Sequence, residues 1–322
     1  MIEWLNQHVG ADAATYLGTF LAIVALVYGG SKIVKRVQKQ KQNVEAEGIA
    51  IQAGQNVTLT QNNGMSFSEV KELCLLFLRD NFPALREEAI KAAEDNVRSF
   101  SEKLESKIVE YSQNIVLEKF KDPDVQAAIN DAVQACARKG ERANTEILTN
   151  LIATRVSSNS NDFLDIVLSE AVLVAPKLTK QQISYLSLIH YMTSCSLNGI
   201  AHISAVEPMS RNVFPAVVGG FGISESQKQH LQYAGTCSIV KMSSVNIHDG
   251  WMNTFYKGLG YTDLNKFKSD ITSFCPYTER LLNEFDKDSH GGEVSLTSVG
   301  QAIAIANLAT MVKGMDYSIW IK

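Results

Sequence analysis

The stretch "GTFLAIVALVYGGSKIVKR", Gly18 to Arg36, changes from apolar to basic at Ser31. From Ala13 to Ser31 the chain carries no ionisable side chain except tyrosine. As a helix rising about 1.5 Å per residue, this segment nearly covers a hydrocarbon core of about 30 Å. It therefore predicts a transmembrane helix, with a buried core helix as the alternative.

The charges on either side of this segment predict its orientation. Glu3 and Asp12 precede it, and five basic residues follow it: Lys32, Lys35, Arg36, Lys39 and Lys41. A cleavable signal peptide would carry positive charge before the apolar run. Because basic residues favour the cytoplasmic side, we expect an uncleaved anchor with the N-terminus outside and the rest of the chain in the cytoplasm.

One face of the predicted span carries only small side chains, which recur at helical spacing: Thr15, Gly18, Ala22, Ala25 and Gly29. Lipid supplies no hydrophobic drive between helices, so association depends on close packing, which small side chains permit. We interpret this stripe as the pore-lining and helix-packing face of a helix that meets copies of itself. Chance clustering of residues that are common in membrane spans is the alternative.

The remaining chain predicts a mainly α protein: one N-terminal transmembrane helix, a short β-hairpin stalk, and a cytoplasmic helical body with a small mixed α/β part at its C-terminal end. The expected segments are 1–45 (periplasmic tip, span and juxtamembrane helix), 46–64 (hairpin), 65–197 (helical domain) and 198–322 (mixed module). The hairpin prediction rests on alternation in "GIAIQAGQNVTLTQNNG". An isolated hairpin is marginally stable, so we expect copies from neighbouring subunits to pair.

Periodicity and turn residues place the helices of the body. We expect one helix to begin after Ser66 and a longer charged helix at about 84–120. Others are expected at about 124–138, 143–155, 161–174, 179–195, 224–234, 246–257, 277–286 and 297–312. Short strands are expected around "CSIVKM" (237–242) and "YSIWI" (317–321). Val294–Val312 also lacks charge, but its polar residues favour a core helix over a second span.

The sequence contains no recognisable catalytic or metal-binding pattern. There is no P-loop, dinucleotide fingerprint or His-Glu-x-x-His motif. The five cysteines share no metal-type or redox-type spacing: Cys74, Cys136, Cys195, Cys237 and Cys275. "GGFG" at 219–222 resembles a phosphate loop, but a flexible connector is the simpler interpretation. The sequence thus predicts no enzyme, no cofactor and no metal. His190, on an apolar helix, is expected to be a hydrogen-bonded core residue.

The net charge of −4 predicts no general affinity for nucleic acids, so a polyanion would need a local basic site. One candidate is the start of the helix at 179–195. Thr179 and Gln182 have the spacing of a capping box, and Lys177 and Lys180 flank the free N–H groups of that helix. We predict an anion-binding role for Lys177, Thr179 and Lys180; an ordinary cap with solvated lysines is the alternative.

The second candidate is "WMNTFYKGLGY", which places Trp251, Tyr256 and Lys257 close together in sequence. Aromatic rings next to basic residues are the combination that single-stranded nucleic acids use for stacking and charge pairing. Core packing of Trp251 and Phe255, four residues apart on a helix, is the alternative.

The order of these parts, together with "VLVAPKLTKQQISYLSLI", "QHLQYAG" and "LTSVGQAIAIANL", resembles a bacterial family of single-span proteins with a polar hairpin before a helical body. Within it, the chain is most similar to the membrane effectors of the Hailong anti-phage defence system. The resemblance implies a homotetrameric ion channel of the inner membrane. It further implies that single-stranded oligodeoxyadenylate, made by a partner nucleotidyltransferase, keeps the channel shut. Loss of this ligand during phage infection would open the channel and arrest growth.

Two other functions stay open from the sequence. A membrane-tethered hydrolase would use a histidine such as His230 or His248, although no nucleophile motif accompanies either. A scaffold would use the span only as an anchor in the lipid bilayer, and an unrelated span would then replace it freely.

Overall fold

The computed structural model describes residues 67–81, 87–158, 161–240, 246–289, 293–312, 315, 317 and 320–321. All of them fall within one compact unit, Gln61–Lys322. The predicted span, its small-sided face (Thr15, Gly18, Ala22, Ala25 and Gly29) and the hairpin at 46–64 lie outside the described residues. Within the described part of the chain, every helix is too short or too polar to span a lipid bilayer.

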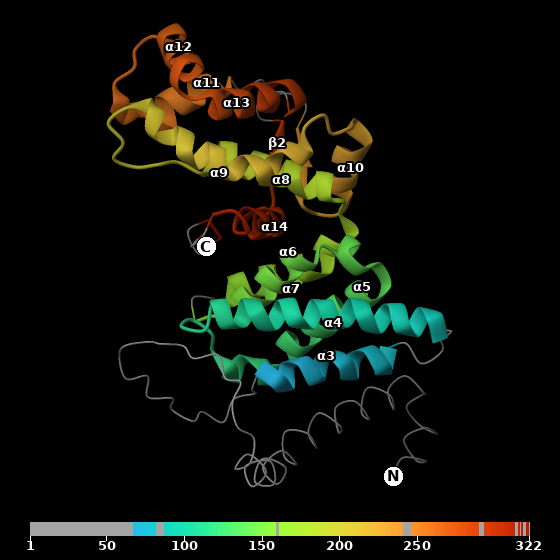
Figure 1. Ribbon diagram of the computed structural model, residues 1–322. Helices are drawn as coiled ribbons and strands as arrows, with labels where there is room; N and C mark the ends of the chain where they lie inside the picture. Colours follow the sequence, from blue (N-terminus) through green and yellow to red (C-terminus); the bar gives the residue numbers. More distant parts are fainter. Residues whose placement is uncertain are drawn as a thin grey trace, which may run out of the picture. The chain divides into compact units, whose positions relative to one another are not determined.

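The described body is mainly α, with one small antiparallel sheet of two strands (Figure 1). Its α-helices are α3 (Phe67–Asn81), α4 (Glu87–Glu110), α5 (Pro123–Lys139), α6 (Thr145–Arg155), α7 (Asp162–Val174), α8 (Lys180–Ser194), α9 (Glu207–Val217), α10 (Glu225–Tyr233), α11 (Ile247–Gly250), α12 (Leu264–Phe274), α13 (Pro276–Ser289) and α14 (Ser298–Leu308). Short 3₁₀ or π turns connect several of them, including η2 (Leu117–Lys121), η5 (Ile203–Val206), η6 (Val218–Gly220) and η7 (Trp251–Phe255). The strands are β1 (Cys237–Ile239) and β2 (Val294–Leu296).

The first group of helices forms around α4. This helix packs against α3, α5 and α6, and α7 packs on both α5 and α6. The buried face of α4 includes Val97, Phe100, Leu104 and Ile108, which recur at helical spacing. The exposed face of the same helix carries its charged residues. The alternation of apolar and charged residues along the sequence is therefore enough to predict which face of α4 is buried.

Helix α14 joins this first group to α8. It contacts α6, α7 and α8, and Figure 1 shows it between them. Seven of its residues are buried: Gly300, Ala302, Ile303, Ala304, Ile305, Ala306 and Leu308. A helix that is apolar on nearly all sides belongs in a core. The prediction that the charge-free run near 297–312 forms a core helix is therefore confirmed.

The second group forms around α8 and α9. Helix α13 packs on both, α12 packs on α13, and α10 leads into β1. The strands pair antiparallel with Cys237 opposite Leu296 and Ile239 opposite Val294. The pairing therefore brings together two points of the chain with α11, α12 and α13 between them.

The prediction of one long helix at about 84–120 is wrong. Helix α4 ends at Glu110, and turns lead to an isolated bridge between Ile115 and Ser157. The backbone N–H of Val116 donates to the Val156 carbonyl at 2.8 Å. This pairing with a distant segment replaces the local helical hydrogen bonds, and only the short turn η2 follows it.

Of the two predicted short strands, one is found among the described residues. "CSIVKM" does form β1, but its partner is Val294–Leu296, which belongs to the charge-free run expected to be helical. At the described residues of "YSIWI" the backbone turns, because the N–H of Ile321 donates to the Tyr317 carbonyl at 2.9 Å. Helices α9 and α12 were not predicted.

The "GGFG" stretch is more constrained than a flexible connector. A Cβ on Gly220 would collide with the backbone of Tyr185 and Ser184 on α8. The absence of a side chain at Gly220 is what lets η6 lie directly on α8, and so sets the position of Phe221.

Candidate ligand-binding surface

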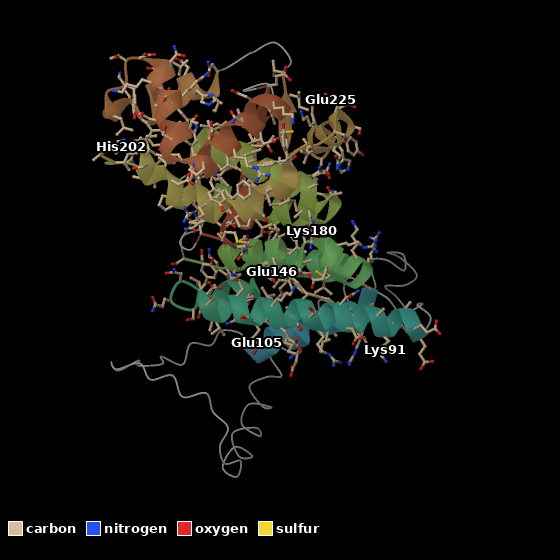
Figure 2. The ribbon with its side chains drawn as sticks, turned by 45° about the horizontal axis from the view of Figure 1, so that its top comes forward. Lys91, Glu105, Glu146, Lys180, His202 and Glu225 are labelled. Carbon is tan, nitrogen blue, oxygen red and sulfur yellow. The ribbon has the colours of Figure 1, made fainter. Side chains whose placement is uncertain are left out.

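The start of α8 has the predicted capping box. The Gln182 N–H donates to Thr179 Oγ1 at 3.2 Å, and the Thr179 N–H donates to Gln182 Oε1 at 3.0 Å. Lys177 and Lys180 are exposed on either side of the cap, and Figure 2 labels Lys180. The pKa of Glu141 is lowered mainly by a hydrogen bond from Lys103, with a smaller contribution from the charge of Lys180. Lys180 therefore lies within electrostatic range of an acid as well as of the helix N-terminus.

Trp251 and Tyr256 belong to the core. Trp251 is 1% exposed and donates from Nε1 to the Met192 carbonyl at 2.9 Å, and Tyr256 is 3% exposed. Their ring centroids are 5.4 Å apart. Neither ring presents an open face to a base in this structure, whereas the following Lys257 is exposed. Among the described residues no hydrogen bond or ring contact joins this group to the Thr179 cap.

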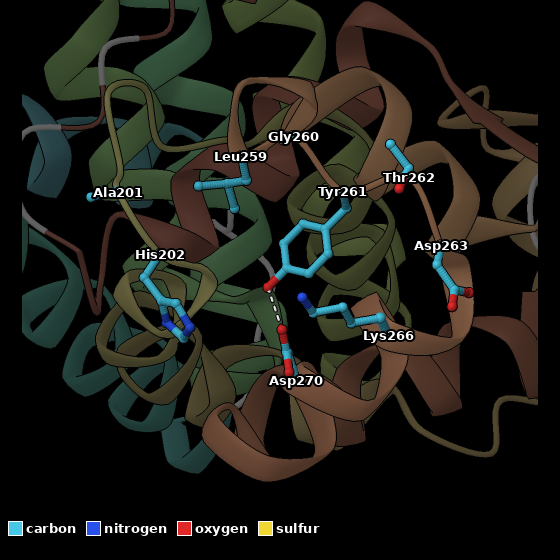
Figure 3. A pocket seen from close by; sticks show the side chains of 9 residues that line it. All are labelled: Ala201, His202, Leu259, Gly260, Tyr261, Thr262, Asp263, Lys266 and Asp270. Carbon is cyan, nitrogen blue, oxygen red and sulfur yellow. Dashed lines mark hydrogen bonds between the residues drawn. The ribbon is translucent and has the colours of Figure 1, made fainter.

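A polar cavity of about 300 Å³ opens just after this segment (Figure 3). Its lining consists of Ala201, His202, Leu259, Gly260, Tyr261, Thr262, Asp263, Lys266 and Asp270. The Tyr261 hydroxyl donates to Asp270 Oδ2 at 2.7 Å. Burial, then the hydrogen bond and charge of Asp270, raise the pKa of Tyr261 to about 12. The phenol thus stays protonated at neutral pH, with its proton directed at the carboxylate.

The two histidines considered for hydrolysis are both engaged in other contacts. His230 Nδ1 lies 3.0 Å from Gln182 Nε2. His248 is 7% exposed, and its Nδ1 lies 3.4 Å from Asp286 Oδ2. Within the described residues no hydroxyl or thiol hydrogen-bonds to the His248 ring. No cluster of histidine, cysteine, aspartate and glutamate in the same residues could hold a metal ion.

A surface that the sequence did not predict lies where α9, α13 and the end of η6 meet. Two arginines and three aromatic rings form it, and we term it the arginine–aromatic surface: Arg211, Phe214, Phe221, Tyr277 and Arg280.

The five side chains of the arginine–aromatic surface form a continuous series of contacts in space. The Arg211 guanidinium carbon lies 5.5 Å from the Tyr277 ring centroid. The Phe214 ring meets the Tyr277 ring edge to face at 5.1 Å and the Phe221 ring at 6.0 Å. The guanidinium of Arg280 lies 4.9 Å from the Phe214 centroid and 5.8 Å from that of Phe221. These are distances at which cation–π attraction operates.

Both arginines keep their charge available. Arg211 and Arg280 are exposed, and within the described residues neither forms an ion pair. Tyr277 is 36% exposed, while Phe214 and Phe221 are half-buried. A guanidinium on an aromatic ring also covers apolar surface, so part of this arrangement contributes to packing. Within the described residues neither guanidinium donates a hydrogen bond, so both can donate to an anion.

A buried carboxylate fixes α13 against α9 beneath this surface. Glu207 accepts hydrogen bonds from the N–H groups of Tyr277 at 3.0 Å and Thr278 at 3.2 Å. These are N–H groups of the first turn of α13, where a negative charge is favourable. The Thr278 hydroxyl donates to Ser210 Oγ at 2.7 Å, which adds a second link between the helices. The spacing of Arg211 and Tyr277 is therefore set by buried hydrogen bonds.

The arginine–aromatic surface also reaches the predicted anion site. Gln181, the residue after Lys180, donates from Nε2 to the Phe221 carbonyl at 3.4 Å. The start of α8 and the aromatic rings are thus joined through one contact. The only local sequence signal for the arginine–aromatic surface is that α9 and α13 each carry an arginine and an aromatic residue three positions apart. These pairs are Arg211 with Phe214 and Tyr277 with Arg280. Such pairs share a helix face.

The comparison with protein families found one match. A family model described as ":-like" matches residues 64–261 and 252–321. No curated protein and no solved structure matches the chain.

Proposed function

We propose that this chain, which belongs to the family whose model matches residues 64–261 and 252–321, is an oligomeric membrane effector whose helical body binds a single-stranded oligonucleotide. The observation that carries this proposal is the arginine–aromatic surface. Surfaces that bind single strands combine cationic groups for the backbone with rings on which bases stack. Here exposed Arg211 and Arg280 lie beside Tyr277, Phe214 and Phe221.

The location of the charge supports an oligonucleotide over a duplex. The net charge of −4 disfavours a broad electrostatic footprint of the kind that duplex DNA requires. A short single strand needs only a few cations and some exposed ring surface. Lys177 and Lys180, next to the Gln181–Phe221 contact, extend the positive charge toward the start of α8.

The membrane part of the proposal rests on the sequence. We propose that the span at Ala13–Ser31 anchors the chain in the bacterial inner membrane and that its small-sided face assembles a homotetrameric ion channel. The ligand is single-stranded oligodeoxyadenylate from a partner nucleotidyltransferase, and it holds the channel closed until phage infection destroys it. A ligand that binds the closed state better by a few kcal/mol keeps nearly all channels shut.

The test is direct extraction of the ligand. The full-length protein is expressed with its genomic neighbours, purified in detergent, and its 260/280 nm absorbance ratio measured before and after single-strand-specific nuclease. We expect a raised ratio that the nuclease abolishes, together with recovery of a short oligodeoxynucleotide. A protein-like ratio would contradict a tightly bound nucleic acid.

The site is tested in the same preparation. Arg280→Ala removes the guanidinium that lies on two rings, whereas Arg98→Ala removes an exposed arginine on α4 that takes no part in the surface. We expect Arg280→Ala alone to lower the recovered nucleic acid. Equal recovery from both variants would place the ligand elsewhere.

A further inference from the structure

We propose that the ligand-binding surface continues onto α10, where Tyr233 and His230 form a second nucleotide contact. This inference rests on the proposed binding of a single strand and specifies where that strand runs. The residues concerned lie at the C-terminal end of α10, whose first residue Glu225 is labelled in Figure 2.

Tyr233 presents its ring to solvent. Tyr233 is 89% exposed, although Leu231 on the same helix is fully buried. Its centroid lies 6.3 Å from that of His230, and the two rings are tilted by 35°. A tyrosine ring in this position offers an open face on which a base can stack.

The hydrogen bonds of Gln182 determine which nitrogen of His230 carries the proton. The side-chain oxygen of Gln182 accepts from the Thr179 N–H in the capping box, so its NH₂ group points the other way. That NH₂ group donates to the Gln227 carbonyl at 2.9 Å and meets His230 Nδ1 at 3.0 Å. Because an amide NH₂ can only donate, Nδ1 is the acceptor and Nε2 carries the hydrogen in the neutral ring. The exposed imidazole therefore presents a hydrogen-bond donor next to the Tyr233 ring.

A continuous series of contacts joins this pair to the arginine–aromatic surface. Phe221 accepts from Gln181, whose Oε1 in turn accepts from Gln227 Nε2 at 2.9 Å. Gln227 lies on α10, less than two turns before Tyr233. Phe221, Gln181 and Gln227 are all half-buried, and Tyr233 at the end of the path is exposed, so the linking residues are partly accessible to solvent. A strand that stacks on Tyr277 or Phe221 can thus continue past the start of α8 to Tyr233.

This geometry predicts a binding site with two stacking positions separated by a polar stretch. A very short strand reaches only one position, and a longer strand occupies both. Affinity should therefore rise with length until the second position is filled. For comparison, single-strand sites on OB-folds take about 4–16 nucleotides.

The test measures affinity against ligand length. Full-length protein in detergent is freed of nucleic acid by a single-strand-specific nuclease that is then removed. Labelled oligodeoxyadenylates of about 2 to about 12 nucleotides are titrated by fluorescence anisotropy. We expect Tyr233→Ala to weaken the long strands about tenfold and leave the shortest unchanged. Tyr233→Phe keeps the stacking face and should bind like the wild type.

Three outcomes would overturn the inference. Tyr233→Ala could leave every length unchanged while Arg280→Ala weakens all of them; the second contact would then be absent and the proposed function would stand. Loss of affinity at every length would contradict a site with two positions. Phe163→Ala removes an exposed ring from α7, away from this path. If it lowers the affinity for long strands as much as Tyr233→Ala does, the loss comes from removing any exposed ring and not from a second contact at Tyr233. If the wild-type protein binds no strand of any length, the proposed function itself fails.

Discussion

Arg155 connects three segments through one buried guanidinium. Its side chain is 7% exposed, and it reaches Asp124 at 3.0 Å, Asp165 at 2.9 Å and Asp122 at 3.4 Å. Asp122 caps α5 and Asp165 lies on α7, so the arginine at the end of α6 holds both helices. Burial alone would raise the pKa of Asp124, but the hydrogen bonds from Ser169 and Arg155 and the arginine charge outweigh it and lower that pKa.

Replacing Arg155 by methionine should therefore destabilise the body strongly. Removing one partner of a buried ion pair leaves uncompensated carboxylates, and we expect a loss of about 3 kcal/mol in the free energy of unfolding. This loss is at the low end of the range for breaking a buried ion pair because the side chains of Asp122 and Asp124 are 44% and 57% exposed. Urea denaturation of the full chain in detergent measures it. Arg138→Met, at a position on α5 that forms no ion pair within the described residues, is the control and should change stability little; comparable losses in both would contradict this role.

His190 is a core residue, as predicted, but its predicted hydrogen bond is not found. Its side chain is fully buried, and neither ring nitrogen has a partner among the described residues. The ring instead meets Trp320 edge to face at 5.0 Å. Burial lowers the pKa of His190 to about 4, so the imidazole is neutral throughout the physiological range. Sequence could indicate burial from the apolar helix but not the absence of a partner.

The low pKa of His190 predicts a specific dependence of stability on pH. Between about pH 6.5, the ordinary pKa, and about pH 4, the unfolded state binds a proton that the folded state does not. Stability should therefore fall as the pH is lowered through this window. His190→Leu should remove that part of the loss, as seen in melting temperatures measured across the same range. A pH profile that is unchanged by His190→Leu would show that the folded histidine titrates normally.

At the scale of elements, caps and turn residues made most helices predictable. The Thr179–Gln182 box begins α8 at Lys180, and the Asp122 cap with Pro123 begins α5. The predictions that were wrong concern segments whose structure depends on partners far away in the sequence. Residues 115–116 leave the helix because they pair with 156–157, and β2 exists because β1 lies opposite it. Helix α9 contains Pro215, which is unfavourable inside a helix, whereas Pro208 lies in the first turn, where proline is tolerated.

The contact between η6 and α8 gives a prediction at this scale. Gly220→Ala should cost about 3 kcal/mol, because its methyl group would meet the backbone of Tyr185 and Ser184, which cannot rotate away. The same change should weaken ligand binding, since Phe221 follows directly. Gly250→Ala is the matched control, since a Cβ at that position would meet no other atom within 4 Å. Equal stability of the two variants, measured by urea denaturation, would show that η6 can move aside.

For the whole molecule, the candidate site was only half predictable. The start of α8 carried a local signal, a capping box flanked by lysines. The arginine–aromatic surface had none of comparable strength, because Arg211, Phe221 and Arg280 lie on three separate segments. Conversely, Trp251 and Tyr256 are close in sequence to basic residues but packed inside. Local composition cannot tell an exposed ring from a buried one.

Assembly through the predicted span can be tested independently of the ligand. Gly18→Leu places a large side chain on the small-sided face, and we expect it to lower the oligomer mass in detergent and to abolish the conductance of reconstituted protein from which nucleic acid has been removed. Ile23→Leu, on the opposite apolar side, should leave both unchanged. An unaltered mass and conductance in Gly18→Leu would contradict a packing role for this stripe.

The central position of α14 has a consequence for the timing of synthesis. The helix occupies the space between α6, α7 and α8, yet the ribosome makes it long after them. Until translation has passed Leu308, those three helices lack the apolar helix against which they pack in the finished body. Chains fold as they emerge, and exposed apolar surface recruits chaperones or proteases. A polypeptide truncated before Ser298 should therefore be degraded, so only completed chains would accumulate.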